Sequence, residues 1–288
     1  MSTVSTATTP APTGAPPRRR PPRRAGHTAI GVGIVAVMLF PLYWMLNVSL
    51  QPAGGAVATP WLPFDLTLDG YATAVREQSG NLVTSLLVGL GSVVFSLLVA
   101  TPAAYAMAQF RLRWATPVLF AVLITQMVPG IVVANALYSA YSDLGLLNTV
   151  GGLVLADSAA GVPFSILVMR AFMAGIPPSI VEAAYVDGAG HVRAFVSVVL
   201  PMARNALITA GLFTFLFAWG DFLFALTLTT TEDVRPVTLS LYTYVGSFVN
   251  DWSPIMATAV LSSLPAIALL LVAQRYVATG VTGGAVKS

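Results

Sequence analysis

Four long stretches without a charged side chain constrain the fold of this chain more than any other feature. They are residues 28–50, 78–110, 114–142 and 252–274. A helix rises ~1.5 Å per residue and the hydrocarbon core of a bilayer is ~30 Å thick, so about 20 apolar residues can cross it. We therefore predict that each stretch forms a membrane-spanning helix.

Two further apolar stretches, about 149–174 and 203–228, are each interrupted by an acid, Asp157 in the first and Asp221 in the second. An acid at the centre of a spanning helix costs roughly 2.5–3.5 kcal/mol, which a dozen or more Leu, Ile, Val and Phe residues can offset. With both stretches included, the sequence predicts an all-α, polytopic membrane protein with six transmembrane helices.

The composition excludes a soluble globule and most enzyme chemistry. Charged residues make up only 9% of the 288 residues and hydrophobic residues 56%, whereas a soluble domain has about 25% charged residues. The chain has no cysteine, only one lysine, Lys287, and only two histidines, His27 and His191, and it lacks the G-x-x-x-x-G-K-[ST], H-E-x-x-H and G-x-S-x-G motifs. We therefore expect no catalytic residue, no metal site and no cofactor in this chain.

The predicted organisation places a disordered Pro- and Arg-rich tail before the first span. A secretory signal is the rival interpretation of this end, because Ala56-Val57-Ala58 resembles a cleavage site, but the 23 uncharged residues at 28–50 exceed the ~7–15 of a signal peptide. The predicted segments are a tail at 1–26, a first span at 28–50, an extracytoplasmic loop at 51–80, a transmembrane core at 81–275 and a C-terminal tail at 276–288. Within the core we expect spans at about 82–109, 115–141, 149–174, 203–228 and 253–275, with a loop at 176–201.

Basic residues are sorted by side in the six-span arrangement, which places both termini on the same side. That side receives twelve basic residues, including the cluster at 18–24, and the other side only Arg76 and Arg235. Because cytoplasmic loops of membrane proteins carry the excess of Lys and Arg, we predict a multi-pass protein of the bacterial cytoplasmic membrane with both termini in the cytoplasm.

A small-residue stripe runs along the second predicted span. Ser92, Ser96, Ala100, Ala104 and Ala108 recur every four residues. Such a stripe allows another helix to approach closely. Packing within the subunit is the simpler interpretation, and lining of a transport path is the alternative.

The loop between the fourth and fifth spans has well-defined helix signals. Ser179 followed by Glu182 has the spacing of a capping box, so a helix should begin there. Gly188 can adopt the left-handed conformation that ends helices, so the helix should stop near Asp187. A helix this short cannot cross a bilayer. These local helix signals alone are equally consistent with a loop that only returns the chain to the membrane, with Pro201 marking the start of the next helix.

This loop also carries a family resemblance. Glu182-Ala183-Ala184 is followed after three residues by Gly188, after nine more by Val198, and after one more by Leu200-Pro201. This spacing resembles the EAA loop of permease subunits of bacterial ABC importers, with valine where isoleucine is usual. The tail at 280–287 resembles the ending of the maltose-type, carbohydrate-importing branch, as does the segment 217–226, although Gly220-Asp221 stands where the family often has Asn-Glu.

The resemblance implies a type I ABC importer permease fold and several partners. Such a permease pairs with a second homologous permease, sits on two ATPase subunits that bind ATP and Mg, and receives sugar from an extracytoplasmic binding protein; membrane lipid surrounds it, and no nucleic acid is involved. The loop would couple to the ATPase, with Val181 and Tyr185 as an apolar contact and small Ala183 and Ala184 permitting close approach. The implied coupling residues are Ser179, Glu182, Ala183, Ala184, Tyr185, Asp187, Gly188, Ala189, Leu200 and Pro201.

Asp221 is the acid that lies deepest in the fifth predicted span. An intramembrane acid marks a functional site by default, and Trp219 and Phe222 lie beside it in the sequence. These three residues are candidates for lining a sugar pathway, although hydrogen bonding between helices explains Asp221 more simply. Asp157 is interpreted as an acid at the membrane interface.

We therefore predict that the chain is the permease subunit of a carbohydrate ABC importer, working by alternating access and performing no covalent chemistry. An ion-coupled secondary transporter is one alternative, but it would need internal repeats and a buried titratable relay. An ABC permease for a non-sugar solute is the other alternative.

Overall fold

A computed structural model describes residues 25–52, 60–62, 64–110, 112–247 and 251–285. The predicted tail at 1–26 therefore lies outside the described residues, apart from its last two. The described residues fall into two units, which divide between Tyr43 and Trp44. Every regular element of the described residues is helical, which agrees with the predicted all-α class.

Helix α1 (Ala25–Ser49) begins in the first unit and ends in the second. Its stretch from His27 to Ser49 is long and apolar enough to span a membrane. Within the second unit, the amide of Asn47 donates to the carbonyl of Pro60 at 2.8 Å, and the hydroxyls of Ser49 and Tyr71 lie 2.8 Å apart. These bonds join the end of α1 to the segment that leads into the next helix.

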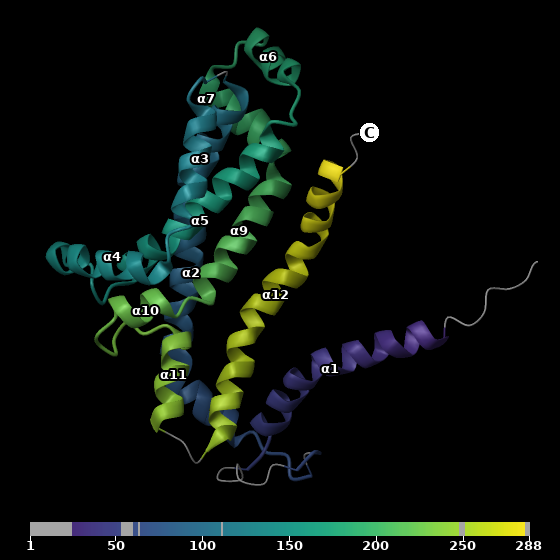
Figure 1. Cartoon of the computed structure of the whole chain (residues 1–288), viewed down its shortest axis with the longest axis vertical. Coiled ribbons are helices and arrows are strands. Elements are labelled where there is room, and N and C mark those ends of the chain that lie inside the picture. The colour runs from purple at the N-terminus through teal and green to yellow at the C-terminus, as the bar shows by residue number, and fades with distance from the viewer. Residues whose placement is uncertain (1–24, 53–59, 63, 111, 248–250, 286–288) are drawn as a thin grey trace, which may run out of the picture. The chain divides into compact units, whose positions relative to one another are not determined.

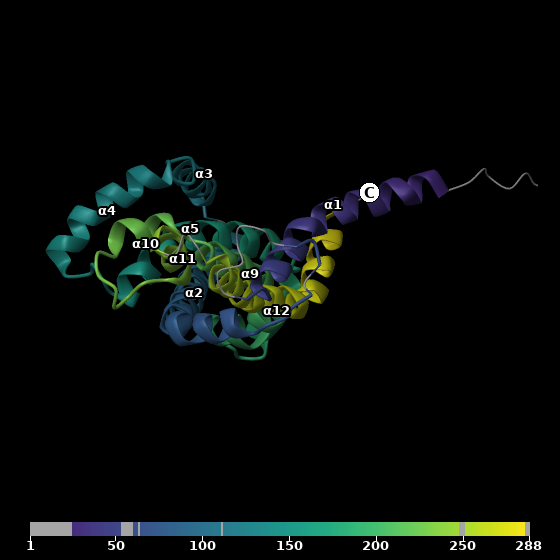
Figure 2. The same cartoon turned by 90° about the horizontal axis from the view of Figure 1, so that it is seen from below.

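The core of the second unit consists of long helices packed side by side. Helices α2 (Asp69–Gln109), α5 (Val150–Met173) and α9 (Arg204–Trp219) contact one another, and α12 (Trp252–Ala285) packs on α2 and α9 (Figures 1 and 2). Together with α1, three of these helices, α2, α5 and α12, pass as single membrane spans by length and composition.

The small-residue stripe on α2 explains how closely these helices approach. Ser92, Ser96, Ala100 and Ala104 are fully buried. A Cβ atom on Gly161 of α5 would lie only 2.6 Å from the Ser96 hydroxyl. Because no larger residue would fit at this crossing, the stripe serves packing within the subunit, the simpler of the two interpretations.

Two other candidate spans are bent pairs of helices. Helix α3 (Ala115–Thr125) meets α4 (Gly130–Leu144) at 92°, and the segment 191–202 meets α9 at 76°. The second segment comprises α7 (His191–Ala194), the π-helical η2 (Phe195–Val199) and α8 (Leu200–Met202). The described residues therefore contain four spans, or six when each bent pair counts as one, which is the predicted number.

Several predicted boundaries differ from the structure. The loop predicted at 51–80 ends earlier, because α2 begins at Asp69, an acid placed favourably in the first turn of a helix. The tail predicted at 276–288 is helical as far as Ala285. The fifth span, predicted as one helix over 203–228, breaks after Trp219 and resumes as α10 (Leu223–Leu228). The break falls at Gly220 and Asp221, which interrupt the apolar run.

Candidate coupling helix and pathway residues

Helix α6 (Pro178–Val186) lies with α7 at one end of the bundle, between α5 and α9 in the chain (Figure 1). It begins two residues earlier than the predicted capping box requires, because a helix capped by Ser179 would begin at Ile180. Pro177 is the N-cap residue and no side chain caps this end. The capping box of Ser179 and Glu182 was therefore wrong: the fixed φ of proline suits the first helical position, where no amide is needed, so Pro178 takes it and Ser179 falls inside the first turn.

The end of α6 matches the prediction. Gly188 has φ +83°, in the left-handed region. The amide of Gly188 donates to the carbonyl of Tyr185 at 3.0 Å, and the amide of Ala189 donates to the carbonyl of Ala184 at 2.9 Å. These two bonds form a Schellman motif, which satisfies the last carbonyls of the helix and turns the chain sharply.

One face of α6 is anchored in the subunit itself. Val181 is buried in a cluster with Tyr105, Met169 and Met173, and Ala184, Tyr185 and Ala189 pack against this cluster. Both side chains thus fix the helix to its own subunit, with Val181 buried and Tyr185 half-buried. Their expected contact with an ATPase stays a prediction.

A chain of polar contacts reinforces this anchor, and sequence analysis missed it. The hydroxyl of Tyr185 lies 3.2 Å from the hydroxyl of Tyr105 on α2 and 3.0 Å from Nδ1 of His191 on α7. The ring of Phe195 lies 4.9 Å from that of Tyr105. Helix α2 thus meets α6 and α7 at Tyr185, although Tyr105 and Tyr185 are 80 residues apart, a proximity that no local pattern could indicate.

The opposite face of α6 is exposed. Val186 is 87% exposed and Ile180 38% exposed, and Ser179, Glu182, Ala183 and Asp187 are exposed as well. This face therefore combines small and apolar groups with two carboxylates. Leu200 and Pro201 belong to α8, where Leu200 is half-buried and Pro201 exposed, so they lie in the connection to α9 rather than on this face.

The three candidate pathway residues lie at the break between α9 and α10 but have separate contacts. Trp219 is 8% exposed, its ring stacks on that of Phe215, and its indole donates to the carbonyl of Ser262 on α12 at 3.0 Å. Phe222 packs edge-on against Tyr242 at 5.2 Å between ring centroids. Trp219 therefore holds two helices together, and its placement does not support a lining role.

Asp221 has a local role that sequence analysis did not foresee. Its carboxylate accepts bonds from the amides of Phe224 at 3.3 Å and Ala225 at 3.0 Å, and these amides belong to the first turn of α10. Hydrogen bonding between helices by this side chain was thus not the correct explanation: the backbone turns after Gly220, which leaves the first amides of α10 in need of an acceptor.

Asp157 was expected at the membrane interface, but it is only 6% exposed and lies two turns inside α5. Elsewhere in the described residues, no group of three or more His, Cys, Asp or Glu side chains could hold a metal ion. The described residues thus place a short, largely exposed helix between two candidate membrane spans.

Comparison with known proteins identifies the family. Residues 92–283 match the family described as binding-protein-dependent transport system inner membrane component. The chain is 30% identical to the diacetylchitobiose uptake system permease protein DasC of Streptomyces coelicolor, over 87% of this chain and 92% of that protein. It is 32% identical to the trehalose transport system permease protein SugB of Mycobacterium tuberculosis, over 92% of this chain and 98% of that protein.

The fold is also found in a solved structure. A crystal structure of a bacterial ABC transporter involved in the import of alginate is similar with a TM-score of 0.76 and 23% identity, over 91% of this chain and 99% of the matched chain. The chain therefore belongs to this family of permeases. It is a multi-pass inner-membrane component of a binding-protein-dependent ABC importer, and ATP is bound by the partner ATPase and not by this chain.

Proposed function

We propose that this permease imports a sugar, a mono- or oligosaccharide, by alternating access driven by the partner ATPases. The observation that carries the choice of cargo is the similarity to the permeases named for diacetylchitobiose and trehalose, which extends over nearly the whole chain. The ABC importer fold alone does not distinguish cargo, because it also occurs in a methionine transporter, with a TM-score of 0.55.

The exposed face of α6 is the proposed docking surface for an ATPase subunit. Ala183 allows a close approach, Ile180 and Val186 supply the apolar contact, and Glu182 and Asp187 can pair with basic side chains. If docking hides about 200–300 Å² of apolar area, burial contributes roughly 5–7 kcal/mol before ordering costs. Because the opposite face is packed on α2 and α7, a force applied to α6 would be transmitted into the spans.

The proposed assembly contains a second homologous permease, two ATPase subunits and an extracytoplasmic sugar-binding protein. The α6 end of the bundle faces the cytoplasm, and both termini lie on that side. The distribution of basic residues supports this orientation, because the six-span topology assigns twelve of them to the side of the loop that contains α6 and only Arg76 and Arg235 to the other.

Uptake by the assembled transporter tests the choice of cargo. Cells that carry the complete transporter should accumulate at least one of radiolabelled trehalose, maltose and diacetylchitobiose, and a deletion of this permease should abolish that uptake. Methionine serves as the control solute and should neither be accumulated nor compete. Uptake of methionine, with none of the three sugars transported, would contradict the proposed cargo.

A further inference from the structure

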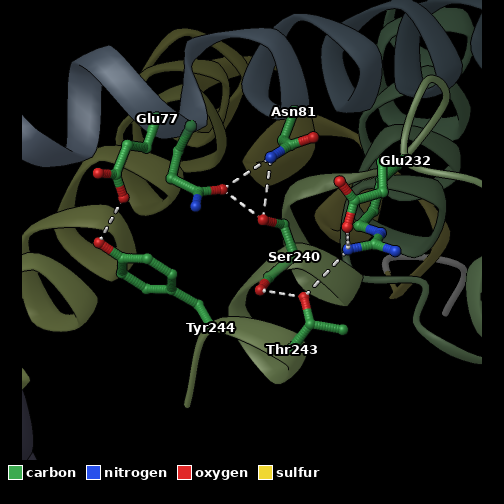
Figure 3. A pocket seen from close by; sticks show the side chains of 8 residues that line it. Glu77, Asn81, Glu232, Ser240, Thr243 and Tyr244 are labelled. Carbon is green, nitrogen blue, oxygen red and sulfur yellow. Dashed lines mark hydrogen bonds and ion pairs between the residues drawn. The ribbon is translucent and has the colours of Figure 1, made fainter. Parts of the chain in front are cut away.

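A polar cavity of about 410 Å³ lies between the beginning of α2 and the short helix α11 (Val237–Ser247). It is at the end of the bundle opposite α6 (Figure 1). Its volume is within the ~300–1,000 Å³ of small-molecule sites, but such sites usually have mainly apolar walls. Carboxylates, amides, hydroxyls and a guanidinium line this one instead (Figure 3).

Part of the wall is already held in place by its own hydrogen bonds. The Oε1 atom of Gln78 accepts from Nδ2 of Asn81 at 2.8 Å and from the hydroxyl of Ser240. The hydroxyl of Tyr244 donates to Glu77 at 2.9 Å, and burial together with this bond raises the pKa of Tyr244, so the phenol stays protonated at neutral pH. These bonds join α2 to α11, and a ligand would find the wall pre-organised.

Two donors in the cavity wall have no acceptor among the residues that the structure describes. Gln78 is 5% exposed, and its Nε2 donates to no other described residue, although its Oε1 accepts two bonds. Arg235 has a buried Nε without a partner among the described residues, while its Nη1 contacts Glu232 at 3.3 Å and Thr243 at 3.4 Å. Of these two atoms, Nε of Arg235 is the one that is buried without a partner among the described residues. Because an unpaired buried donor costs free energy, it favours a ligand that accepts hydrogen bonds, and Nε2 of Gln78 can donate to the same ligand.

The charges narrow the class of ligand. The carboxylates of Glu77 and Glu232 and the guanidinium of Arg235 line the cavity. Arg76 lies beside Glu77 at 3.7 Å, so the charges nearly balance and favour neither an anion nor a cation. A metal ion does not fit the cavity either, because the described residues contain no group of three or more His, Cys, Asp or Glu side chains that could bind one. A neutral polyol fits, because each of its hydroxyls can donate to a carboxylate and accept from an amide or guanidinium.

We propose that this cavity is an outer binding subsite for a neutral sugar, occupied before the sugar enters the path through the membrane. The proposal rests on the proposed function and adds to it a place on this chain where the cargo binds. The unused donors of Gln78 and Arg235 bind sugar hydroxyls, and Thr243 positions the guanidinium.

The test is equilibrium binding of radiolabelled trehalose, maltose and diacetylchitobiose to the purified, fully assembled transporter in nanodiscs, without the binding protein. Gln78→Glu keeps the oxygen that serves Asn81 and Ser240 but removes the free donor. Thr243→Val removes the hydroxyl that holds Arg235. The matched control is Thr209→Val on α9, because both threonines donate to a carbonyl four residues earlier in their own helix, but Thr209 lies outside the cavity.

For the sugar that binds, we expect each cavity variant to raise Kd by about three- to ten-fold, the value of one hydrogen bond, and Thr209→Val to leave it unchanged. If wild type imports a sugar but neither cavity variant changes its Kd, the subsite is wrong while the proposed function stands. If the transporter imports a non-sugar solute alone, the proposed function itself fails.

Discussion

Gly188 is the residue on which the shape of the α6 turn depends most. Its φ of +83° is strained for any residue with a side chain, although an added Cβ would meet no atom within 4 Å. A substitution there therefore acts through the backbone and not through a clash. Gly190 offers a natural comparison, since it has no neighbour within 4 Å either but an ordinary φ of −73°.

We predict that Gly188→Val lowers sugar uptake several-fold at equal amounts of transporter in the membrane, while Gly190→Val retains it. The left-handed conformation costs a β-branched residue about 1–2 kcal/mol or more, which would unwind the end of α6 on the proposed docking surface. Uptake and substrate-stimulated ATP hydrolysis should be measured together. Equal values for the two valine variants would show that this turn is not part of the coupling.

The carboxylate of Asp221 caps the first turn of α10, so its replacement should affect the stability of this turn. Asp221→Asn keeps an oxygen acceptor and should leave the thermal stability of the complex nearly unchanged. Asp221→Leu leaves two amides unsatisfied and should cost about 1–2 kcal/mol. The measurement is the Tm of the purified complex for the three proteins. A loss of transport in the Asn variant with an unchanged Tm would instead assign the acid to ion coupling.

The two faces of α6 differ, because one is packed against its own subunit and the other is exposed. The buried face carries Val181 and Tyr185, and the exposed face carries Ala183 and Val186. A helix that was exposed all round could swing without moving the spans. The contacts of Tyr185 with α2 and α7 are what make α6 a lever in the proposed function.

Tyr185→Phe tests this link between elements. Loss of the hydroxyl removes two contacts, at about 0.5–1.5 kcal/mol each, so more ATP should be hydrolysed per sugar imported. Tyr138→Phe is the control, because Tyr138 is 42% exposed on α4 and far in sequence from the coupling loop. The ratio of ATP hydrolysed to sugar imported is the quantity to measure. A ratio equal to that of wild type would mean that the hydroxyl contacts do not carry the coupling.

Helix ends and spans that depend on local chemistry could be predicted from the sequence. Features that depend on contacts between distant residues could not. The end of α6 follows from Gly188 alone, and the spans follow from hydropathy. The start of α6 was misplaced because the sequence offers two helix-start signals, Ser179 as a cap and Pro178 as a first helical residue. The helix begins at Pro178. Helix α11 and its cavity were missed because they depend on pairs such as Gln78 and Ser240, which are 162 residues apart.

The second unit, residues 44–288, has two ends that the proposed function places on opposite sides of the membrane. Helix α6 marks one end, and α11 with the polar cavity marks the other (Figure 1). The chain has no cysteine of its own, so single cysteines can report the side directly.

We predict that a membrane-impermeant thiol reagent added to intact cells labels cysteines introduced at Ser142 or Thr231 but not one at Ser179. All three positions are exposed in the structure, so a difference in labelling reflects the side of the membrane and not burial. Permeabilised cells are the control and should show labelling at all three positions. Labelling of Ser179 in intact cells would reverse the proposed orientation.

The most direct test of the central claim, an ATP-driven permease working through α6, is sugar uptake by reconstituted vesicles that contain the assembled transporter and binding protein. With proton and sodium gradients dissipated, we expect wild type to accumulate sugar only when ATP is present on the α6 side. Ala183→Arg, which places a large side chain on the docking face, should abolish both uptake and ATP stimulation without affecting membrane insertion. Uptake that follows an ion gradient and ignores ATP would contradict the account.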